Sequence, residues 1–305
     1  MAVERISRNK PKATDKSEVE IDYMGAGETT QPSDNLLDYC VLLYGESAIG
    51  KTSLLTQIPD CYIIQFDPKR SGLKARQTNI PDLTIGDMNK NRVKHSSWDM
   101  ACSVIERALN DDSVRCIGID NFGLMYEHAV RHVCWQEGIK DPQENNDYGK
   151  TWNVLNDMFR QVVNSCLYNQ KGLFIVSHDV TREVEEGDGS KYDRIEPALM
   201  KGARKWVKEV TDFAFYMRFY KDQRVITVRN SKEIWVKCCT DIENPRFVDS
   251  EGNLLYNISA GSSPQEAWSN LLSGFNNEIN DVDKIEEEAK LSKSAKLKKK
   301  LVKKS

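Results

Sequence analysis

Two patterns of apolar and polar positions alternate along the middle of the chain. Short, almost wholly apolar runs occupy residues 38–45, 61–67, 114–121 and 172–179. Runs of roughly four to eight such residues, bounded by polar loops, are typical of strands buried inside a sheet. Residues 51–58, 96–111 and 148–169 instead place apolar side chains three and four positions apart, which predicts amphipathic helices. Pro59 is expected to end the first of these helices.

The pattern changes after residue 179. Residues 180–197 alternate polar and apolar positions around an Asp-Gly-Ser turn, which predicts a β-hairpin. A short basic helix is predicted at 199–210 and another helix at 264–275, and the β-rich runs between them are 211–220, 223–230 and 233–240. Strands that alternate with helices and then give way to antiparallel runs predict an α/β fold. The expected architecture is a mostly parallel central sheet with helices on both faces and an antiparallel β extension.

Composition divides the chain into three predicted parts. Residues 1–35 form a polar, flexible arm without the apolar segment of a signal peptide, residues 36–258 form one core, and residues 259–305 form a helix and a lysine-rich tail. No apolar run approaches the roughly 20 residues that span a bilayer, so no membrane is expected as a partner. The eight cysteines include no CxxC pair, which favours reduced thiols and a soluble, cytoplasmic protein. The net charge of −3 restricts any attraction to nucleic acid to a local patch.

The sequence GESAIGKT at 45–52 matches the phosphate-binding motif G-x-x-x-x-G-K-[ST]. Its glycines allow backbone N–H groups to point inward at a phosphate, and the context of a preceding strand and a following helix is the one that the motif requires. Lys51 is expected to reach the β- and γ-phosphates, and the Thr52 hydroxyl to hold Mg²⁺. The residues expected to contact the nucleotide are Gly45, Glu46, Ser47, Ala48, Ile49, Gly50, Lys51, Thr52 and Ser53.

Two later strands end in residues that suit the same site. Asp120 closes the apolar strand VRCIGID and is expected to hold Mg²⁺ together with Thr52, as a Walker B carboxylate does. Ser177 and His178 end the strand at 172–179, where His178 would face the γ-phosphate; the alternative is an ordinary surface histidine. A complete strand lies in sequence between the phosphate loop and Asp120, and no guanine-reading NKxD motif occurs. This order favours an ATPase over a GTPase.

These pieces give the chain a family resemblance. It resembles the RecA-like P-loop ATPases and, more closely, the phage-type AAA-domain nucleotide-binding proteins, which include the minimal RecA-core single-strand annealing recombinases of phages. The resemblance rests on YGESAIGKTSL, IIQFDP, IGIDNF, DYGKTW, LFIVSHD, the hairpin EVEEGDGSKYDRIEP, LMKGARKWVKEVTDFAFYM and EIWVKCCTD, and covers about residues 38–242. It implies a RecA-like core that binds ATP with Mg²⁺ and assembles into rings or filaments. It also implies a role in DNA recombination, annealing or repair, in the cytoplasm of a phage-infected bacterium.

One position departs from this family's pattern. RecA-like enzymes usually carry a catalytic glutamate two residues past the aspartate that ends the second strand, and here that position holds Lys69. An ammonium that is already protonated cannot accept a proton from the attacking water. Asp67 is the nearest acid and the candidate substitute, so the expected catalytic residues are Lys51, Asp67, Asp120 and His178. Hydrolysis therefore stays an open question at this point, whereas nucleotide binding is expected.

Candidate partners follow from charge and from the resemblance. Single-stranded DNA would need lysines and arginines such as Lys201, Arg204, Lys205 and Lys208 around Trp206, or the tail from Lys290, which carries eight lysines and no acid. At helical spacing Trp206 more often faces a core than a base, and the hairpin at 180–197 is acidic. The resemblance implies a homo-oligomer and admits a single-strand-binding protein as a further partner. A basic residue from a neighbouring subunit often completes such ATP sites, and the candidates are Arg224, Arg229, Lys232 and Lys237.

The leading hypothesis is therefore an ATP-hydrolysing RecA-like protein that acts on single-stranded DNA. A P-loop kinase for small molecules is one alternative, and it would require an arginine-rich lid where the sequence instead predicts β-structure. A nucleotide switch that scaffolds replication proteins without hydrolysing ATP is the other, and Lys69 supports it. His128 and His132 lie four residues apart on a predicted helix, but a zinc site needs further ligands, so they are interpreted as ordinary helix residues.

Overall fold

The computed structural model describes residues 32–67, 74–91, 93–169, 171–240 and 245–279. The chain divides into two units, Met1–Pro32 and Ser33–Ser305, and of the first unit only Pro32 is described. Most of the predicted N-terminal arm, Lys69 and the lysine-rich tail therefore lie outside the described residues.

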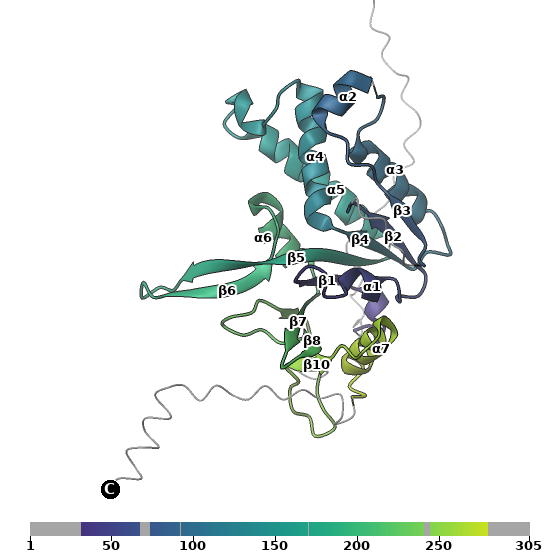
Figure 1. Ribbon diagram of the computed structural model, residues 1–305, viewed down its shortest axis with the longest axis vertical. Coiled ribbons are helices and arrows are strands. Elements are labelled where there is room, and N and C mark those ends of the chain that lie inside the picture. Colours follow the sequence, from purple (N-terminus) through teal and green to yellow (C-terminus); the bar gives the residue numbers. More distant parts are fainter. Residues whose placement is uncertain (1–31, 68–73, 92, 170, 241–244, 280–305) are drawn as a thin grey trace, which may run out of the picture. The chain divides into compact units, whose positions relative to one another are not determined.

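A ten-stranded sheet organises the described part of the chain, in the order β10-β8-β7-β1-β5-β4-β2-β3, with β6 paired to β5 and β9 to β7 (Figure 1). Its strands are β1 Cys40–Gly45, β2 Cys61–Gln65, β3 Gln77–Asn79, β4 Cys116–Asp120, β5 Gly172–Glu185, β6 Lys191–Pro197, β7 Phe213–Tyr220, β8 Gln223–Thr227, β9 Lys237–Cys238 and β10 Asn257–Ser259. The six strands from β7 to β3 are parallel, whereas β8, β10, β6 and β9 pair antiparallel. The predicted α/β fold is confirmed.

Helices connect the parallel strands. They are η1 Leu36–Asp38, α1 Lys51–Leu55, α2 Ile85–Asn91, α3 Ser97–Leu109, α4 Phe122–Glu137, η2 Pro142–Asn145, α5 Lys150–Tyr168, α6 Lys201–Val210 and α7 Pro264–Phe275. Local sequence fixes several of their ends: Ser96 and Asp99 form a capping box at α3, and Gly138 ends α4 in the left-handed conformation. The pattern of apolar positions predicts no boundaries for α2 and α4.

Side chains of successive strand residues enter two separate cores, because they point to opposite faces of the sheet. On one face, α3, α4, α5 and α6 pack aromatic residues such as Phe122, Phe159 and Trp206 against the strands. On the other face, α1 and α7 pack against Phe213 and Phe215 of β7. Both faces of β1 are therefore buried, which explains why its sequence is apolar throughout.

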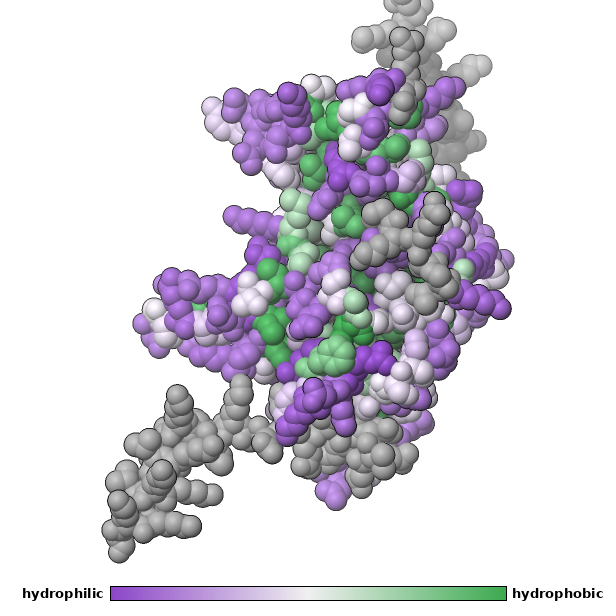
Figure 2. All heavy atoms as spheres, in the orientation of Figure 1, coloured by the Kyte–Doolittle hydropathy of each residue, from purple (hydrophilic) through white to green (hydrophobic). Residues whose placement is uncertain are grey.

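Two differences from the sequence-based prediction concern the β-rich half. The strand predicted at 172–179 and the first arm of the predicted hairpin are one continuous strand, β5, which runs past the sheet and pairs with β6 as a projecting ribbon (Figure 1). The run predicted at 233–240 shortens to β9 and a single bridge between Ile234 and Ile195. Hydrophilic residues cover most of the projecting ribbon in Figure 2.

The helix α7 lies beyond the predicted boundary at residue 258, and it contributes to the core. Trp268, Leu271 and Phe275 are buried in the same cluster as the strand residues Phe213 and Phe215. The division of the chain at 258 stays a prediction from composition.

Candidate functional site

The loop between β1 and α1 has the shape that its glycines permit. Gly45 has φ +155°, and a Cβ added there would lie 2.1 Å from the carbonyl oxygen of Met217 on β7. Gly50 has φ +112°, where a side chain would be strained. Both motif glycines are therefore required by backbone geometry, independently of any ligand.

The Lys51 side chain folds back along this loop. It is 6% exposed, and its Nζ donates hydrogen bonds to the carbonyl oxygens of Gly45 at 2.7 Å and Glu46 at 2.6 Å. These bonds hold a positive charge against the inner surface of the loop. The neighbouring Glu46, Ser47 and Ala48 are exposed, as loop residues that meet a ligand from solvent would be.

Thr52 and Asp120 meet although they are 68 residues apart. The Thr52 hydroxyl donates a hydrogen bond to Asp120 Oδ2 at 2.5 Å. Asp120 ends β4 and is 5% exposed, and Thr52 lies in the first turn of α1. The two predicted Mg²⁺ ligands are thus brought together at the carboxyl edge of the parallel strands, where ligands of such sheets bind.

The electrostatics of Asp120 follow from its surroundings. Burial raises the pKa of Asp120 above its ordinary value, and the nearby Asp67 carboxylate raises it too. The hydrogen bonds from Thr52 and Gln65 and the positive charge of Lys51 lower the pKa and partly offset these effects. Asp67 therefore lies in the neighbourhood of the Asp120 carboxylate.

Gln65 also belongs to this site, although the sequence by itself predicts no role for it. It ends β2 in register with Asp120 of β4, is 4% exposed, and its amide hydrogen-bonds to the Asp120 carboxylate. Its Oε1 atom is buried without a hydrogen-bond partner among the described residues. A glutamine inside an otherwise apolar strand was the available signal in the sequence, and only the strand pairing shows what it faces.

The oxygen atoms gathered here suit a magnesium ion and its waters. Mg²⁺ prefers one or two carboxylate or hydroxyl ligands and keeps several waters. Asp120 and Thr52 supply such ligands, and the orphaned Gln65 Oε1 is an acceptor that a metal-bound water could satisfy. The residues present therefore fit the ion that the phosphate-loop motif implies.

His178 reaches the same edge on β5. It pairs in register with Gly45, and its carbonyl oxygen accepts hydrogen bonds from the N–H of Ala198 at 2.7 Å and from Ser177 Oγ at 3.1 Å. These bonds fix the backbone at the point where the ribbon leaves the sheet. The strand β5 also separates β1 from β4, so His178 is held between the phosphate loop and the Asp120 strand.

Three further residues near the site, Ile49, Ser53 and Asn121, make contacts that mainly stabilise the fold. Ile49 is buried in the core beneath α1, and Ser53 is half-buried in the first turn of that helix. Asn121 directly follows Asp120, and its side chain accepts a hydrogen bond from the N–H of Gly123 at 2.8 Å, which caps α4.

The four basic residues proposed for a neighbouring subunit's site make contacts within their own chain. Lys232 pairs with Glu186 at 2.9 Å, and Lys237 donates to carbonyl oxygens at the end of α6. Arg229 donates to the carbonyl oxygens of Arg246 and Phe247. Arg224 lies against the phosphate loop of its own chain, with Nη1 3.4 Å from a Cβ built on Gly50.

The basic helix α6 shows only part of the features expected of a DNA surface. Trp206 is 9% exposed and packs edge-to-face on Phe159, so it belongs to the core. Lys208 pairs with Glu196 at 2.8 Å. Lys201 and Lys205 remain exposed on the outer side of the helix.

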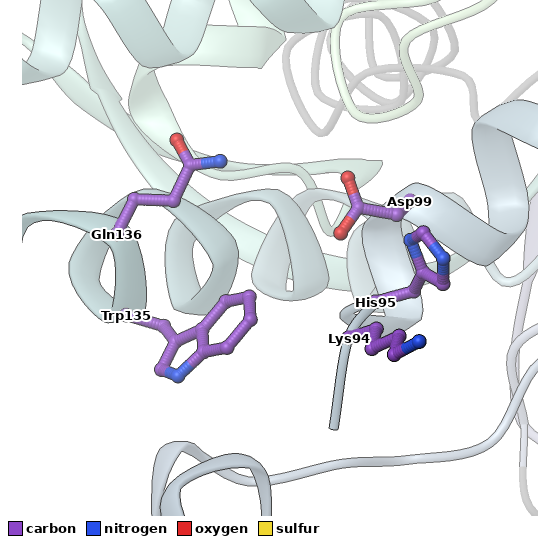
Figure 3. Close-up of a pocket in the computed structure, with 5 residues that line it drawn as sticks. All are labelled: Lys94, His95, Asp99, Trp135 and Gln136. Carbon is purple, nitrogen blue, oxygen red and sulfur yellow. The ribbon is translucent and has the colours of Figure 1, made fainter. Parts of the chain in front are cut away.

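A hollow lies between the start of α3 and the end of α4, lined by Lys94, His95, Asp99, Trp135 and Gln136 (Figure 3). None of the predicted nucleotide-site residues lines it. Behind it, Ser96 Oγ lies 2.8 Å from His132 Nδ1, and Asp99 Oδ2 lies 3.6 Å from the same nitrogen. A catalytic triad would use opposite nitrogens of the ring, so this cluster is interpreted as the cap of α3. No cluster of three or more histidine, cysteine, aspartate or glutamate side chains able to hold a metal occurs within the described ranges.

Comparison with known proteins agrees with this geometry. The profile of the AAA domain family matches residues 37–238, which span β1 through β9 and include the whole site. The chain belongs to this family of nucleotide-binding domains. No match was found among the curated proteins. None of the helices in the described segments is long and apolar enough to cross a membrane.

Proposed function

We propose that this protein binds and hydrolyses ATP with Mg²⁺ and couples this to single-stranded DNA in phage-type recombination, annealing or repair. The observation that best supports nucleotide binding is the Thr52–Asp120 hydrogen bond, which joins the phosphate-binding motif to the aspartate at the end of β4. In the sheet, β5 lies between β1 and β4. Its polar end is therefore placed between the phosphate loop and Asp120, which supports an ATPase over a GTPase.

Each residue has a role in this proposal. Backbone N–H groups of the loop from Gly45 to Gly50 hold the phosphates, and the Lys51 ammonium leaves its two carbonyl acceptors to neutralise them. When bound, Mg²⁺ offsets the charge of the phosphate oxygens. Thr52 and Asp120 would hold that ion, and Gln65 orients the Asp120 carboxylate. Asp67 accepts the proton of the attacking water, and His178 senses the terminal phosphate.

The DNA part rests on the resemblance to phage recombinases and on the exposed lysines of α6. Lys201 and Lys205 are exposed on one helix, where they can neutralise backbone phosphates. The acidic ribbon of β5 and β6 suits a protein partner better than DNA, because Glu183 and Asp193 lie opposite each other on it. A ring or filament of identical subunits and a single-strand-binding protein are the partners that this proposal includes.

The test of the enzymatic part measures ATP binding and ATP turnover separately, with and without single-stranded DNA. Wild-type protein is expected to bind ATP and to turn it over faster with DNA, and Lys51→Ala is expected to lose both. Binding without turnover in either condition would support the second candidate, a nucleotide switch that does not hydrolyse ATP. That candidate is favoured by Lys69 at the usual glutamate position.

The test of the DNA part is the anisotropy of a labelled oligonucleotide across a salt series. Lys201→Gln with Lys205→Gln should weaken binding and make the salt slope shallower by about 0.7 for each DNA phosphate that the variant no longer neutralises. The matched control is Lys90→Gln with Lys140→Gln, two exposed lysines elsewhere. Equal behaviour of the two double variants would contradict a role for α6 in DNA binding.

A further inference from the structure

The β7–β8 hairpin extends past the edge of the sheet on which the phosphate loop lies. Met217 of β7 pairs with Gly45, and β7 continues to Tyr220 before the chain turns at Lys221 and Asp222. Both turn residues have positive φ, as a two-residue hairpin turn requires. The returning strand β8 then brings Arg224 back towards the loop.

The Arg224 side chain lies beside the phosphate loop. Its Nη1 lies 3.4 Å from a Cβ built on Gly50, and its Nη2 donates a hydrogen bond to the carbonyl oxygen of Gly261 at 3.2 Å. The backbone of Arg224 is fixed as well, because its carbonyl oxygen accepts a hydrogen bond from the N–H of Ala260. The guanidinium is therefore held in place by the segment that directly follows β10.

The charge of this guanidinium is not balanced by an acid within the described segments. Among these residues, no carboxylate forms an ion pair with Arg224, and the nearby Glu266 is instead hydrogen-bonded to Ser262. The next residue after Gly50 is Lys51, whose ammonium lies inside the same loop. Two cations held at one loop repel each other unless an anion lies between them, and an arginine fork matches a phosphate.

We propose that Arg224 binds, from within the same chain, the phosphates that ATP and ADP share. The inference rests on the proposed nucleotide binding and adds a phosphate contact from outside the loop motif. Arg224 is expected to contact the phosphates that ADP and ATP share, because it lies beside Gly50, and Gly50 belongs to the backbone that surrounds the β-phosphate. The inference also distinguishes Arg224 from a residue that would act on a neighbouring subunit's nucleotide.

The experiment compares calorimetric dissociation constants for ADP and ATP in the full-length protein. Arg224→Gln should weaken both nucleotides by about ten- to a hundredfold, as expected for one charge-assisted hydrogen bond. Arg224→Lys should recover part of the affinity, since it keeps the charge but not the fork. The matched control is Lys221→Gln, which removes the same charge from the turn of the same hairpin and should change affinity by less than about twofold.

The melting temperature without nucleotide separates ligand contact from mere support of the loop. It should stay unchanged in Arg224→Gln, while the stabilisation by ADP shrinks. Unchanged affinity, a loss confined to ATP, or a loss that parallels a lower melting temperature would each overturn the proposal. A wild-type protein that binds neither nucleotide would instead refute the proposed function itself.

Mixed subunits test whether the arginine acts within its own chain. Arg224→Gln subunits, whose phosphate loop is intact, are mixed with Lys51→Ala subunits, whose arginine is intact. If Arg224 acts within its own chain, the mixture binds ADP no better than Arg224→Gln alone at the same concentration. Restored affinity in the mixture would show that the arginine acts on a neighbour and would overturn the assignment.

Discussion

Asp120 is the carboxylate on which the proposed metal site depends. Its carboxylate must be ionised to bind Mg²⁺, and burial raises its pKa above the ordinary value. The Mg²⁺-dependent part of nucleotide affinity should therefore fall as pH is lowered through this raised pKa, at a higher pH than an ordinary aspartate would give. Isothermal titration with Mg²⁺–ADP across a pH series, with ADP in chelator as the control, measures this dependence.

Removing the Thr52 hydroxyl should shift this profile in a defined direction. The hydrogen bond that Thr52 donates lowers the Asp120 pKa, so Thr52→Val should raise that pKa and move the loss of Mg²⁺-dependent affinity to higher pH. An unshifted or lower midpoint would contradict the role assigned to this bond.

Asp67 is the residue that separates a hydrolytic site from a switch. If it is the general base, Asp67→Asn should lower ATP turnover by about 10²–10⁴-fold and leave ATP affinity nearly unchanged, because the amide cannot take a proton. Single-turnover measurements with saturating ATP test this. Turnover at the wild-type rate would exclude the role and direct attention to another acceptor.

At the scale of elements, the contact between β1 and β7 fixes the mouth of the phosphate loop. A side chain at Gly45 would strike the Met217 carbonyl, so Gly45→Ala should cost at least about 2 kcal/mol in the free energy of unfolding, through displacement of packed backbone. Urea denaturation measures this cost. Gly187→Ala, at the ribbon turn, meets nothing within 4 Å and serves as the control that should be nearly neutral.

At the scale of the whole molecule, α7 closes the core beneath the phosphate loop. Phe275 is 0% exposed and packs edge-to-face with Tyr39 and Phe213. Phe275→Ala should lower the free energy of unfolding by about 3–5 kcal/mol, the usual cost of a buried aromatic. Tyr168→Ala, at an 83% exposed position, is the control. A cost below about 1 kcal/mol for Phe275→Ala would show that α7 is dispensable for the core.

The sequence alone determined the features that depend on neighbouring residues. The apolar runs gave β1, β2, β4 and the start of β5, and the motif from Gly45 to Thr52 gave the turn that joins β1 to α1. Strand and helix signals of this kind are local, because they come from side-chain period, capping residues and glycine conformation. The same holds for Asp120, whose position at the end of an apolar strand was readable directly.

Only the tertiary structure decided which distant residues share a site. Gln65 faces Asp120 through the β2–β4 register, and Arg224 reaches Gly50 because β8 folds back beside β7. Strand order and register are set by pairings between segments far apart in the chain, and no local pattern encodes them. The burial of Trp206 and the continuous strand β5 have the same origin: packing against distant elements determines which side of a helix is covered and where a strand ends.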